Sequence, residues 1–228
     1  MLGLAIPLYD EEACCEQVTL DLLAALKAAH IPARLALVDN GSSDRTTELV
    51  NRLAVAHDAV TAVHLEQNAG YGGGILAGLR ALDTPFLGWC WGDGQVDAAV
   101  VVAAWRKLRA GRFELVKARR VERQDGRQRQ LVTTLYNTLM RAAFALPTGD
   151  VNGCPKLFTR DAWERLDLRS TDWFLDPELM LKAQALGLRW AEVDAVMRPR
   201  PGGASKVRRE TMVEFARRLW AWKRGWRP

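Results

Sequence analysis

The stretch Trp89-Cys90-Trp91-Gly92-Asp93-Gly94-Gln95 follows the apolar run 85–88 and precedes a helical pattern that begins near Asp97. An apolar run that ends in Gly-Asp-Gly is typical of a strand end, so we expect Asp93 at the carboxyl edge of a sheet, where open α/β sheets bind their ligands. The two glycines would let a ligand approach the backbone closely. The stretch therefore predicts a sheet with a ligand site at its edge.

Asp93 and Gln95 are the polar side chains of this stretch. They are two residues apart, so they would point the same way if the strand continued through them. Both are hard oxygen ligands, which suit Mg²⁺ or Mn²⁺ on a substrate diphosphate better than zinc. A plain turn is the competing interpretation, with Asp93 bonded to its own backbone and Asp97 capping the next helix. The residues alone leave both interpretations open.

Strand-like and helix-like segments alternate along the chain. The apolar runs are 2–6, 34–39, 60–65, 85–91, 113–118 and 190–197, and the helix-like segments are 11–29, 44–56, 72–82, 97–109 and 128–145. Alternation of this kind predicts an α/β fold, with a mostly parallel sheet and helices on both faces. With 228 residues and 49% hydrophobic composition, the chain can bury one core as a single domain. The segment 119–129, dense in Arg and Gln, is expected to be a mobile loop.

Charge gathers at the end of the chain, whose net charge is +5. Residues 198–228 hold ten Lys or Arg and two Glu. Helical spacing places one apolar stripe there, made of Met212, Phe215, Leu219, Trp222 and Trp226. Such a basic amphipathic helix either packs on its own domain or lies at a membrane interface, and a basic tail suits an anionic partner. No nucleic-acid recognition motif accompanies it, so we expect no nucleic-acid partner.

Four cysteines, Cys14, Cys15, Cys90 and Cys154, show no CxxC spacing and predict reduced thiols. The chain starts with the strand-like run 2–6, with no basic leader before it. It contains no uncharged apolar run of about 18 residues. We therefore expect a cytoplasmic protein, with a peripheral position at the inner membrane face as an alternative.

The glycine-rich turn 70–74 does not read as a dinucleotide-binding motif. It follows the third predicted strand rather than the first, and the expected glycine spacing and downstream acidic residue are missing. Two explanations remain open: the turn lets a nucleotide approach the backbone, or it lets another part of the chain do so.

Seven segments, in this order, resemble the family 2 glycosyltransferases of the GT-A fold, and in particular the polyprenol-phosphate sugar transferases typified by dolichol-phosphate mannose synthase. They are 6–12 (IPLYDEE), 38–44 (VDNGSSD), 68–70 (NAG), 92–95 (GDGQ), 150–153 (DVNG), 174–179 (FLDPEL) and 200–206 (RPGGASK). The resemblance covers nearly the whole chain. It implies a single GT-A domain, in which residues 1–206 form the catalytic domain and residues 207–228 form its basic C-terminal helix.

The resemblance also implies roles for individual residues. Donor-side residues, for a nucleotide-sugar, would be Pro7, Tyr9, Glu11, Asp39 and Asn68. The divalent cation, Mg²⁺ or Mn²⁺, would be bound by Asp93 and Gln95. Acceptor-side residues would be Arg119 and Arg129, with Thr133 as a further candidate, and a closing terminal loop would supply Arg200, Ser205 and Lys206. Guanidinium groups suit such sites because they bind phosphate oxygens in a bidentate fashion.

Asp176 and Glu178 are candidate catalytic residues together with Asp93. They begin a helix-like stretch, where a carboxylate interacts favourably with the helix dipole. This interaction explains the presence of one of the two carboxylates. Two of them after Trp173-Phe174 favour contact with sugar hydroxyls or with the acceptor. The three histidines lie outside the motifs, and we expect no role for them.

Trp91 departs from the family pattern, which usually has Asp two positions before Asp93. The loss of one carboxylate would weaken the hold on a cation. Trp91 would either stack on a ring of the donor or lie in the core.

The predicted function is inverting, metal-assisted transfer of a sugar from a nucleotide-sugar to a polyprenol phosphate. A lipid phosphate is already an anion at neutral pH, because the second pKa of a phosphate monoester is about 6, so no strong base is needed. Two alternatives remain: transfer to a saccharide, and a nucleotide-sugar-binding module that has lost turnover.

Overall fold

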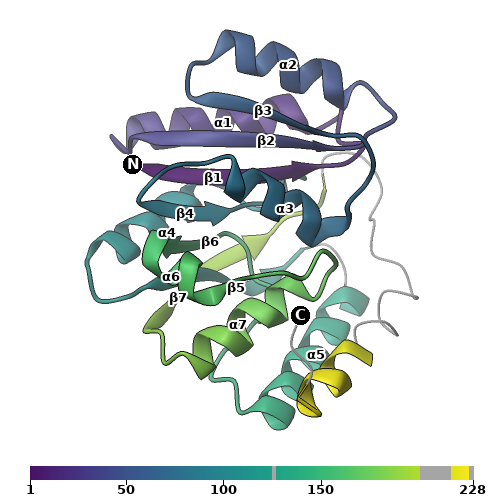
Figure 1. The fold of residues 1–228 in the computed structure, drawn as a ribbon, viewed down its shortest axis with the longest axis vertical. Coiled ribbons are helices and arrows are strands. Elements are labelled where there is room, and N and C mark those ends of the chain that lie inside the picture. The colour runs from purple at the N-terminus through teal and green to yellow at the C-terminus, as the bar shows by residue number, and fades with distance from the viewer. Residues whose placement is uncertain (125–126, 201–216, 226–228) are drawn as a thin grey trace.

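The computed structural model describes residues 1–124, 127–200 and 217–225, without the side chains of Arg123, Leu135 and residues 127–132. Its sheet has seven strands in the order β3-β2-β1-β4-β6-β5-β7 (Figure 1). The strands are β1 Leu2–Leu8, β2 Ala33–Asn40, β3 Val60–Leu65, β4 Phe86–Trp89, β5 Leu115–Arg123, β6 Lys156–Thr159 and β7 Trp190–Met197. The helices are α1 Cys15–Ala28, α2 Thr46–Ala56, α3 Gly70–Arg80, α4 Ala98–Arg109, α5 Arg127–Phe144, α6 Arg160–Leu166 and α7 Leu175–Ala185, followed by a helix at 217–223.

The sheet is mostly parallel and is covered on both faces. β1 pairs in parallel with β2 and β4, β2 with β3, and β5 with β7, whereas β6 runs antiparallel to β4 and β5. In the view of Figure 1, α3, α6 and α7 lie in front of the sheet, while α1 and α4 lie behind it. The predicted α/β class is therefore confirmed.

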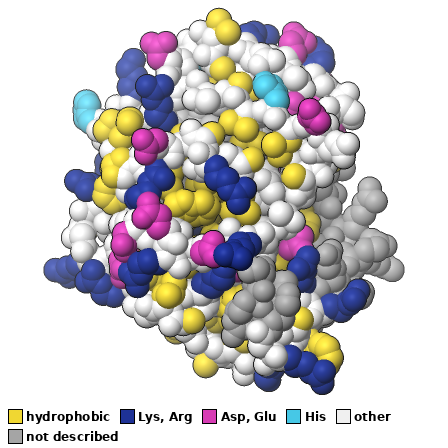
Figure 2. Space-filling view, viewed as in Figure 1, with side chains coloured by type: hydrophobic (Ala, Val, Ile, Leu, Met, Phe, Trp, Pro, Cys, Tyr) yellow, Lys and Arg dark blue, Asp and Glu magenta, His cyan; other side chains and the backbone are white. Residues whose placement is uncertain are grey.

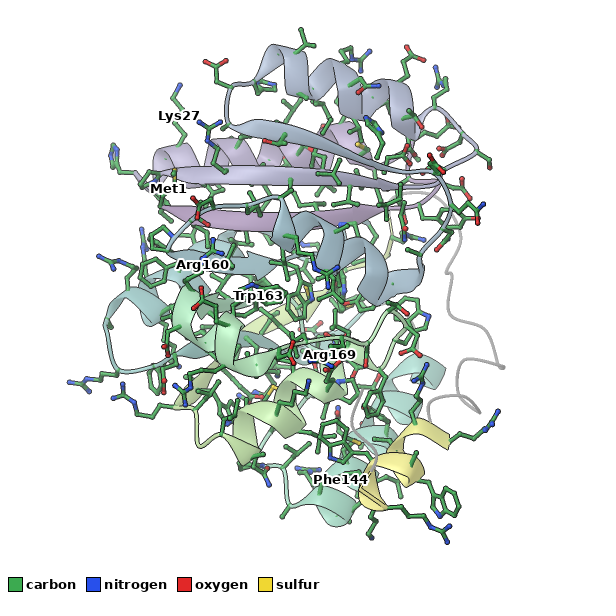
Figure 3. The ribbon with its side chains drawn as sticks, in the orientation of Figure 1. Met1, Lys27, Phe144, Arg160, Trp163 and Arg169 are labelled. Carbon is green, nitrogen blue, oxygen red and sulfur yellow. The ribbon has the colours of Figure 1, made fainter. Side chains whose placement is uncertain are left out.

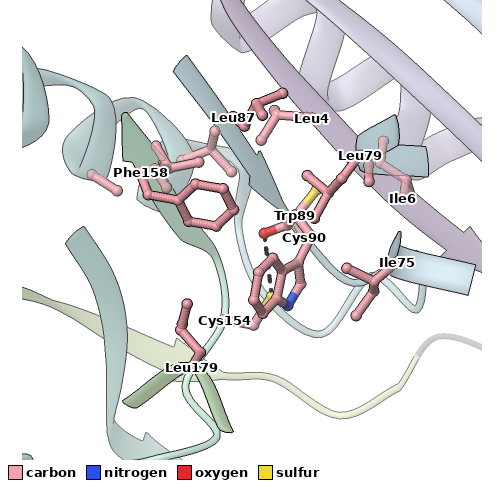
Figure 4. Packing of buried hydrophobic residues seen from close by; sticks show 14 of the residues in the cluster. Leu4, Ile6, Ile75, Leu79, Leu87, Trp89, Cys90, Cys154, Phe158 and Leu179 are labelled. Atoms are coloured by element: carbon pink, nitrogen blue, oxygen red, sulfur yellow. Dashed lines mark hydrogen bonds between the residues drawn. The ribbon is translucent and has the colours of Figure 1, made fainter. Parts of the chain in front are cut away.

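Apolar side chains from the central strands fill the core (Figure 4). Trp89 of β4 meets Phe158 of β6 edge-on, with ring centroids 5.7 Å apart. The Cys154 thiol donates to the backbone oxygen of Trp89 at 3.5 Å. All four cysteines are buried and free, as the sequence predicts.

Two lysines lie fully buried inside this sheet. Lys117 of β5 and Lys156 of β6 are register partners, so they stand directly opposite each other. The row continues to Trp89 of β4 on one side and to Glu192 of β7 on the other. Buried ammonium groups need carboxylate partners, because burial removes their hydration. Lys117 has Glu192 at 3.0 Å, and Lys156 has Asp176 of α7 at 2.5 Å.

Two parts of the fold differ from the sequence prediction. The expected mobile loop at 119–129 is wrong over most of its length, because β5 continues to Arg123 and α5 begins at Arg127. Pairing with β7 stabilises the charged end of β5. The sequence of this end has no alternation of apolar and polar residues that would predict a strand. β6 was missed because it has only four residues. The helix α7 begins at Leu175, so Asp176 and Glu178 lie within its first turn, as the sequence predicts.

The glycine-rich turn opens α3 and packs against the segment 170–172. The backbone N–H of Gly73 donates to Thr171 O at 2.9 Å. A Cβ added to Gly72 would lie 2.9 Å from Asp172 O and closer still to Ser170 O. Gly70 has a φ of +82°, which favours glycine, and a Cβ there would collide with Thr171 O. The close approach in the structure is therefore to another part of the chain.

We expect Gly72→Ala to lower the free energy of unfolding by about 1–3 kcal/mol, because the added methyl forces α3 away from Ser170 and Asp172. Helix propensity alone would favour alanine by about 1 kcal/mol, so a loss identifies the contact as its cause. Urea unfolding measures the difference. Gly149→Ala is the control, because its Cβ would meet the flexible side chain of Arg119. Equal or greater stability of Gly72→Ala would contradict the packing.

Candidate active site

The predicted donor-side residues gather where β1, β2 and β4 end. Asp39 is the second-last residue of β2, beside β1, while Glu11 follows β1 and Asp93 follows β4. The exits of β1 and β2 are joined, since Asp10 N donates to Ser42 Oγ at 3.1 Å and Glu11 N donates to Thr46 Oγ1 at 2.9 Å. The structure therefore brings Asp39, Glu11 and Asp93 to one edge of the sheet, as the sequence predicts.

Asp39 is buried and already hydrogen-bonded. Its carboxylate accepts from Thr47 Oγ1 at 2.6 Å and from Ser42 N at 3.0 Å. Burial raises the pKa of Asp39, but these hydrogen bonds outweigh burial and hold its pKa below the usual value. His64 Nδ1 lies 3.4 Å from the same carboxylate, a contact that the sequence analysis missed. The register pairs Asp39 with His64, and register between strands is not visible in a sequence.

The remaining donor-side candidates surround these groups. Pro7 and Tyr9 are half-buried near the end of β1. Asn68 Oδ1 accepts from Gly70 N at 2.8 Å, so this side chain shapes the turn before α3. Arg200, the last residue described before 217, forms an ion pair with Glu11. Ser205 and Lys206 lie outside the described residues.

The Asp93 loop is a turn rather than a continued strand, because β4 ends at Trp89 and Gly94 has a φ of +70°. The condition for Asp93 and Gln95 to share a strand face is therefore not met. Asp93 Oδ1 accepts from Gln95 N at 3.1 Å. Gln95 is buried, and its Nε2 donates to Arg198 O at 2.9 Å. Asp97 caps α4 by accepting from Ala99 N at 2.8 Å, so this part of the turn interpretation is confirmed.

The described residues contain no group of three or more His, Cys, Asp or Glu side chains placed to share a metal ion. Mg²⁺ needs fewer protein ligands than that, since it commonly binds one or two carboxylates together with substrate phosphates and water. Asp93 is a half-buried carboxylate at the strand edge, and Gln95 adds an amide beside it. Their hard oxygen atoms fit a divalent cation that arrives with a diphosphate.

Asp176 and Glu178 are both buried and bonded to other parts of the chain. Lys156 Nζ donates to Asp176 Oδ1 at 2.5 Å. Burial raises the pKa of Asp176, and the charge of Lys156 opposes this rise. Glu178 accepts from Lys182 Nζ at 2.6 Å and from Ser170 N at 2.8 Å. Glu178 thus holds the segment 170–172, which packs on α3. This segment directly follows Arg169, which is labelled in Figure 3.

Arg119 and Arg120 have different surroundings. Arg119 is half-exposed and bonds to Asp194 at 2.7 Å. Arg120 is buried and forms a bidentate pair with Asp150, with contacts of 2.6 and 2.7 Å. Thr133 is half-buried on α5, and the Arg129 side chain lies outside the described set. Arg120 has no role in the sequence prediction, although its partner Asp150 lies in the quoted motif 150–153.

Asp150 is the counter-charge of Arg120. Burial raises the pKa of Asp150, but the hydrogen-bonded guanidinium of Arg120 outweighs burial and holds its pKa well below the usual value of 3.8. Lys117 is affected in the opposite sense, because burial lowers its pKa to about 8. Both side chains are buried, so their charges lie in the interior of the protein rather than at the strand edge.

The arrangement defines a class of protein. A mostly parallel sheet with carboxylates at its strand ends is the architecture of nucleotide-binding α/β enzymes. The model of the family "Glycosyl transferase family 2" matches residues 4–167. The chain therefore belongs to glycosyltransferase family 2 and is a glycosyltransferase.

Several relatives match most of this chain. A glycosyltransferase of Mycobacterium bovis is 31% identical over 206 residues, which cover 89% of this chain and 87% of that protein. An undecaprenyl-phosphate 4-deoxy-4-formamido-L-arabinose transferase of Proteus mirabilis is 25% identical over 209 residues, covering 90% and 62%. The glycosyltransferase AglD of Haloferax volcanii is 26% identical over 215 residues, and this chain spans only 34% of its length.

A solved structure shares the fold. The glucosyl-3-phosphoglycerate synthase of Mycobacterium tuberculosis, crystallised with Mn²⁺, UDP and phosphoglyceric acid, has a TM-score of 0.73. It is 18% identical, with coverage of 100% of this chain and 80% of that chain. The GT-A fold predicted from the sequence is confirmed.

We expect Asp150→Asn to destabilise the protein at neutral pH by about 3–5 kcal/mol, because Arg120 would stay buried without its counter-charge. The Asp150 carboxylate has a lowered pKa in the folded state. Its contribution is therefore complete above the unfolded pKa, near 3.8, and is lost as the pH falls below that value. Urea unfolding between pH 7 and pH 3 measures both effects.

The control for this experiment is Asp161→Asn, which removes the partner of Arg165 in a pair whose carboxylate is 72% exposed. Exposed pairs contribute about 0–1 kcal/mol. If Asp150→Asn and wild type lost stability in parallel below pH 4, the proposed origin of the acid sensitivity would be wrong.

Proposed function

We propose that this glycosyltransferase moves a sugar from a nucleotide-sugar to a polyprenol phosphate with inversion at the anomeric carbon. The observation that carries the proposal is the state of four carboxylates near the strand edge. Glu11 pairs with Arg200, Asp176 pairs with Lys156, Glu178 pairs with Lys182, and Asp39 is saturated by hydrogen bonds. None of the four is poised as a base, which favours an acceptor that is already an anion.

A lipid phosphate meets this requirement. Its attacking oxygen is negatively charged near neutral pH, because the second pKa of a phosphate monoester is about 6. What remains for the protein is to hold the two substrates in line and to stabilise the leaving diphosphate. The likeness to the Proteus mirabilis transferase, whose name contains undecaprenyl phosphate, supports this class of acceptor.

The donor side is assigned to the edge formed by Pro7, Tyr9, Glu11, Asp39 and Asn68. Asp93 would hold a divalent cation, with Gln95 as its second candidate ligand, and the cation would neutralise charge on the diphosphate. The crystals of the Mycobacterium tuberculosis synthase contain Mn²⁺ with UDP, which is consistent with this assignment. Donor binding would require Arg200 to leave Glu11, which would free its guanidinium for phosphate oxygens.

The acceptor side is assigned to Arg119, Arg129 and Thr133. Arg119 retains 44% side-chain exposure despite its pair with Asp194, so a stronger anion can compete for it. Asp176 lies behind this region in its pair with Lys156, and we assign it a positioning role. Glu178 has the same kind of role, because it holds the backbone of Arg169 and Ser170.

The test is transfer of labelled sugar from UDP-, GDP- and dTDP-sugars to undecaprenyl phosphate with Mn²⁺. We expect Asp93→Ala to abolish transfer and Mn²⁺-dependent nucleotide binding without unfolding the protein, because this carboxylate lies in a turn outside the core. Arg129→Ala should raise the KM for the lipid and leave nucleotide affinity unchanged. Asp21→Ala, on the exposed face of α1, is the control. Full activity of Asp93→Ala, or transfer only to uncharged saccharides, would refute the proposal.

A membrane surface is part of the proposal. Among the described residues, no helix has both the length and the apolar content needed to cross a bilayer. The helix at 217–223 buries Trp222 against Phe174, with ring centroids 5.9 Å apart, so the described part of the apolar stripe faces its own domain. On the opposite side, Trp220 is 59% exposed beneath the guanidinium of Arg224. Basic and hydrophobic side chains lie side by side at this edge in Figure 2.

We expect the wild-type protein to sediment with phosphatidylglycerol vesicles more than with phosphatidylcholine vesicles, because Trp220 and its basic neighbours suit an anionic interface. Trp220→Ala should reduce this binding severalfold. Val55→Ala is the control, since Val55 is 89% exposed on α2, away from this helix. Equal binding of all three proteins would contradict a membrane role for this surface.

A further inference from the structure

Trp91 makes a specific contact at the position where the family pattern has a carboxylate. Its indole N–H donates to the hydroxyl oxygen of Tyr71 at 3.0 Å. The ring is half-buried against the core, and the guanidinium of Arg120 lies 5.8 Å from its centroid. Trp91 is thus held from two sides, by α3 through Tyr71 and by β5 through Arg120.

Tyr71 continues the connection into the acceptor side. Its ring stacks on Trp173, with centroids 4.4 Å apart and planes inclined by 10°. Burial raises the pKa of Tyr71, and the nearby charge of Asp176, the partner of Lys156, raises it further. The next residues of α3 dock on the segment 170–172 through their glycines.

We infer that Trp91 and Tyr71 are positioning residues, which together form a bridge that ties the Asp93 loop to α3 and to Trp173. Asp93 lies two residues from Trp91, so a fixed indole fixes where the loop presents its carboxylate. Trp173 lies three residues before Asp176, on the acceptor side, and the bridge therefore joins the two halves of the site. This inference rests on the proposed function for the roles of Asp93 and Asp176. The contacts that form the bridge do not depend on that function.

The bridge also explains how the chain tolerates the missing carboxylate. An aspartate at position 91 could add a ligand for a cation, but its short side chain lacks the ring and the N–H that reach Tyr71 and face Arg120. The indole offers both, with a hydrogen bond at one edge and a face that attracts a guanidinium. Precise orientation of Asp93 would then compensate for the smaller number of carboxylates.

The test uses Trp91→Phe, which keeps a ring and removes the N–H, and Tyr71→Phe, which removes the hydroxyl. The matched control is Trp105→Phe, because Trp105 is a buried tryptophan of α4 that packs on Phe86 away from the site. Two measurements are made on all variants and on the double variant. They are amide hydrogen exchange over residues 92–97 and 170–173, and kcat and KM for sugar transfer at varied Mn²⁺.

We expect both site variants to exchange faster in these two segments and to lose about tenfold in kcat, the size typical of residues that orient ligands from outside. The double variant should be no worse than either single variant, because both changes break the same bond. Trp105→Phe should affect neither segment. Exchange rates in the site variants that match those of Trp105→Phe, or losses that multiply in the double variant, would overturn the inference.

The two proposals fail in different ways. A wild-type protein that transfers sugar to no anionic acceptor would refute the proposed function, whereas the exchange measurement would still decide the bridge. An active wild type with unchanged exchange in Trp91→Phe and Tyr71→Phe would refute the bridge alone.

Discussion

Two like charges buried opposite each other constrain this structure. Lys117 and Lys156 are fully buried register partners on β5 and β6. Like charges directly opposite on neighbouring strands destabilise a sheet, and buried ammonium groups need partners. Glu192 of β7 and Asp176 of α7 supply them at 3.0 and 2.5 Å. The strand β7 and the helix α7 must therefore dock where they do, or one lysine remains buried without a counter-charge.

The same constraint shapes the active site. Asp176 is held by Lys156, and Glu178 in the same helix turn fixes the segment that packs on α3. Both carboxylates are buried and bonded to other groups of the protein. Asp93 lies in a turn at the strand edge, where its Oδ1 accepts from Gln95 N.

The fold and the positions of the carboxylates at the strand edge were predictable, and the contacts of the arginines on β5 were less so. Asp93 and Asp97 could be placed because an apolar strand followed by Gly-Asp-Gly and a helical pattern is a local signal. Arg120 could not be separated from Arg119, since their difference depends on which one meets Asp150. The sequence did not predict β6, because four residues are too few to show the alternation of apolar and polar side chains that marks a strand. The glycine turn was visible, but its partner at 170–172 lies about a hundred residues away in the chain.

The sequence by itself determined the α/β class, the order of most elements, the edge that bears Asp39 and Asp93, and the resemblance to family 2 glycosyltransferases. These features follow from short-range periodicity and from motifs that are contiguous in the chain. Only the tertiary structure decided what Trp91, Asp176 and Glu178 contact. Their partners are Tyr71, Lys156 and Ser170 with Lys182, and most of these pairs join separate elements. The reason is physical: a buried polar group must be satisfied by whatever group the fold brings to it, and that group need not be near in sequence.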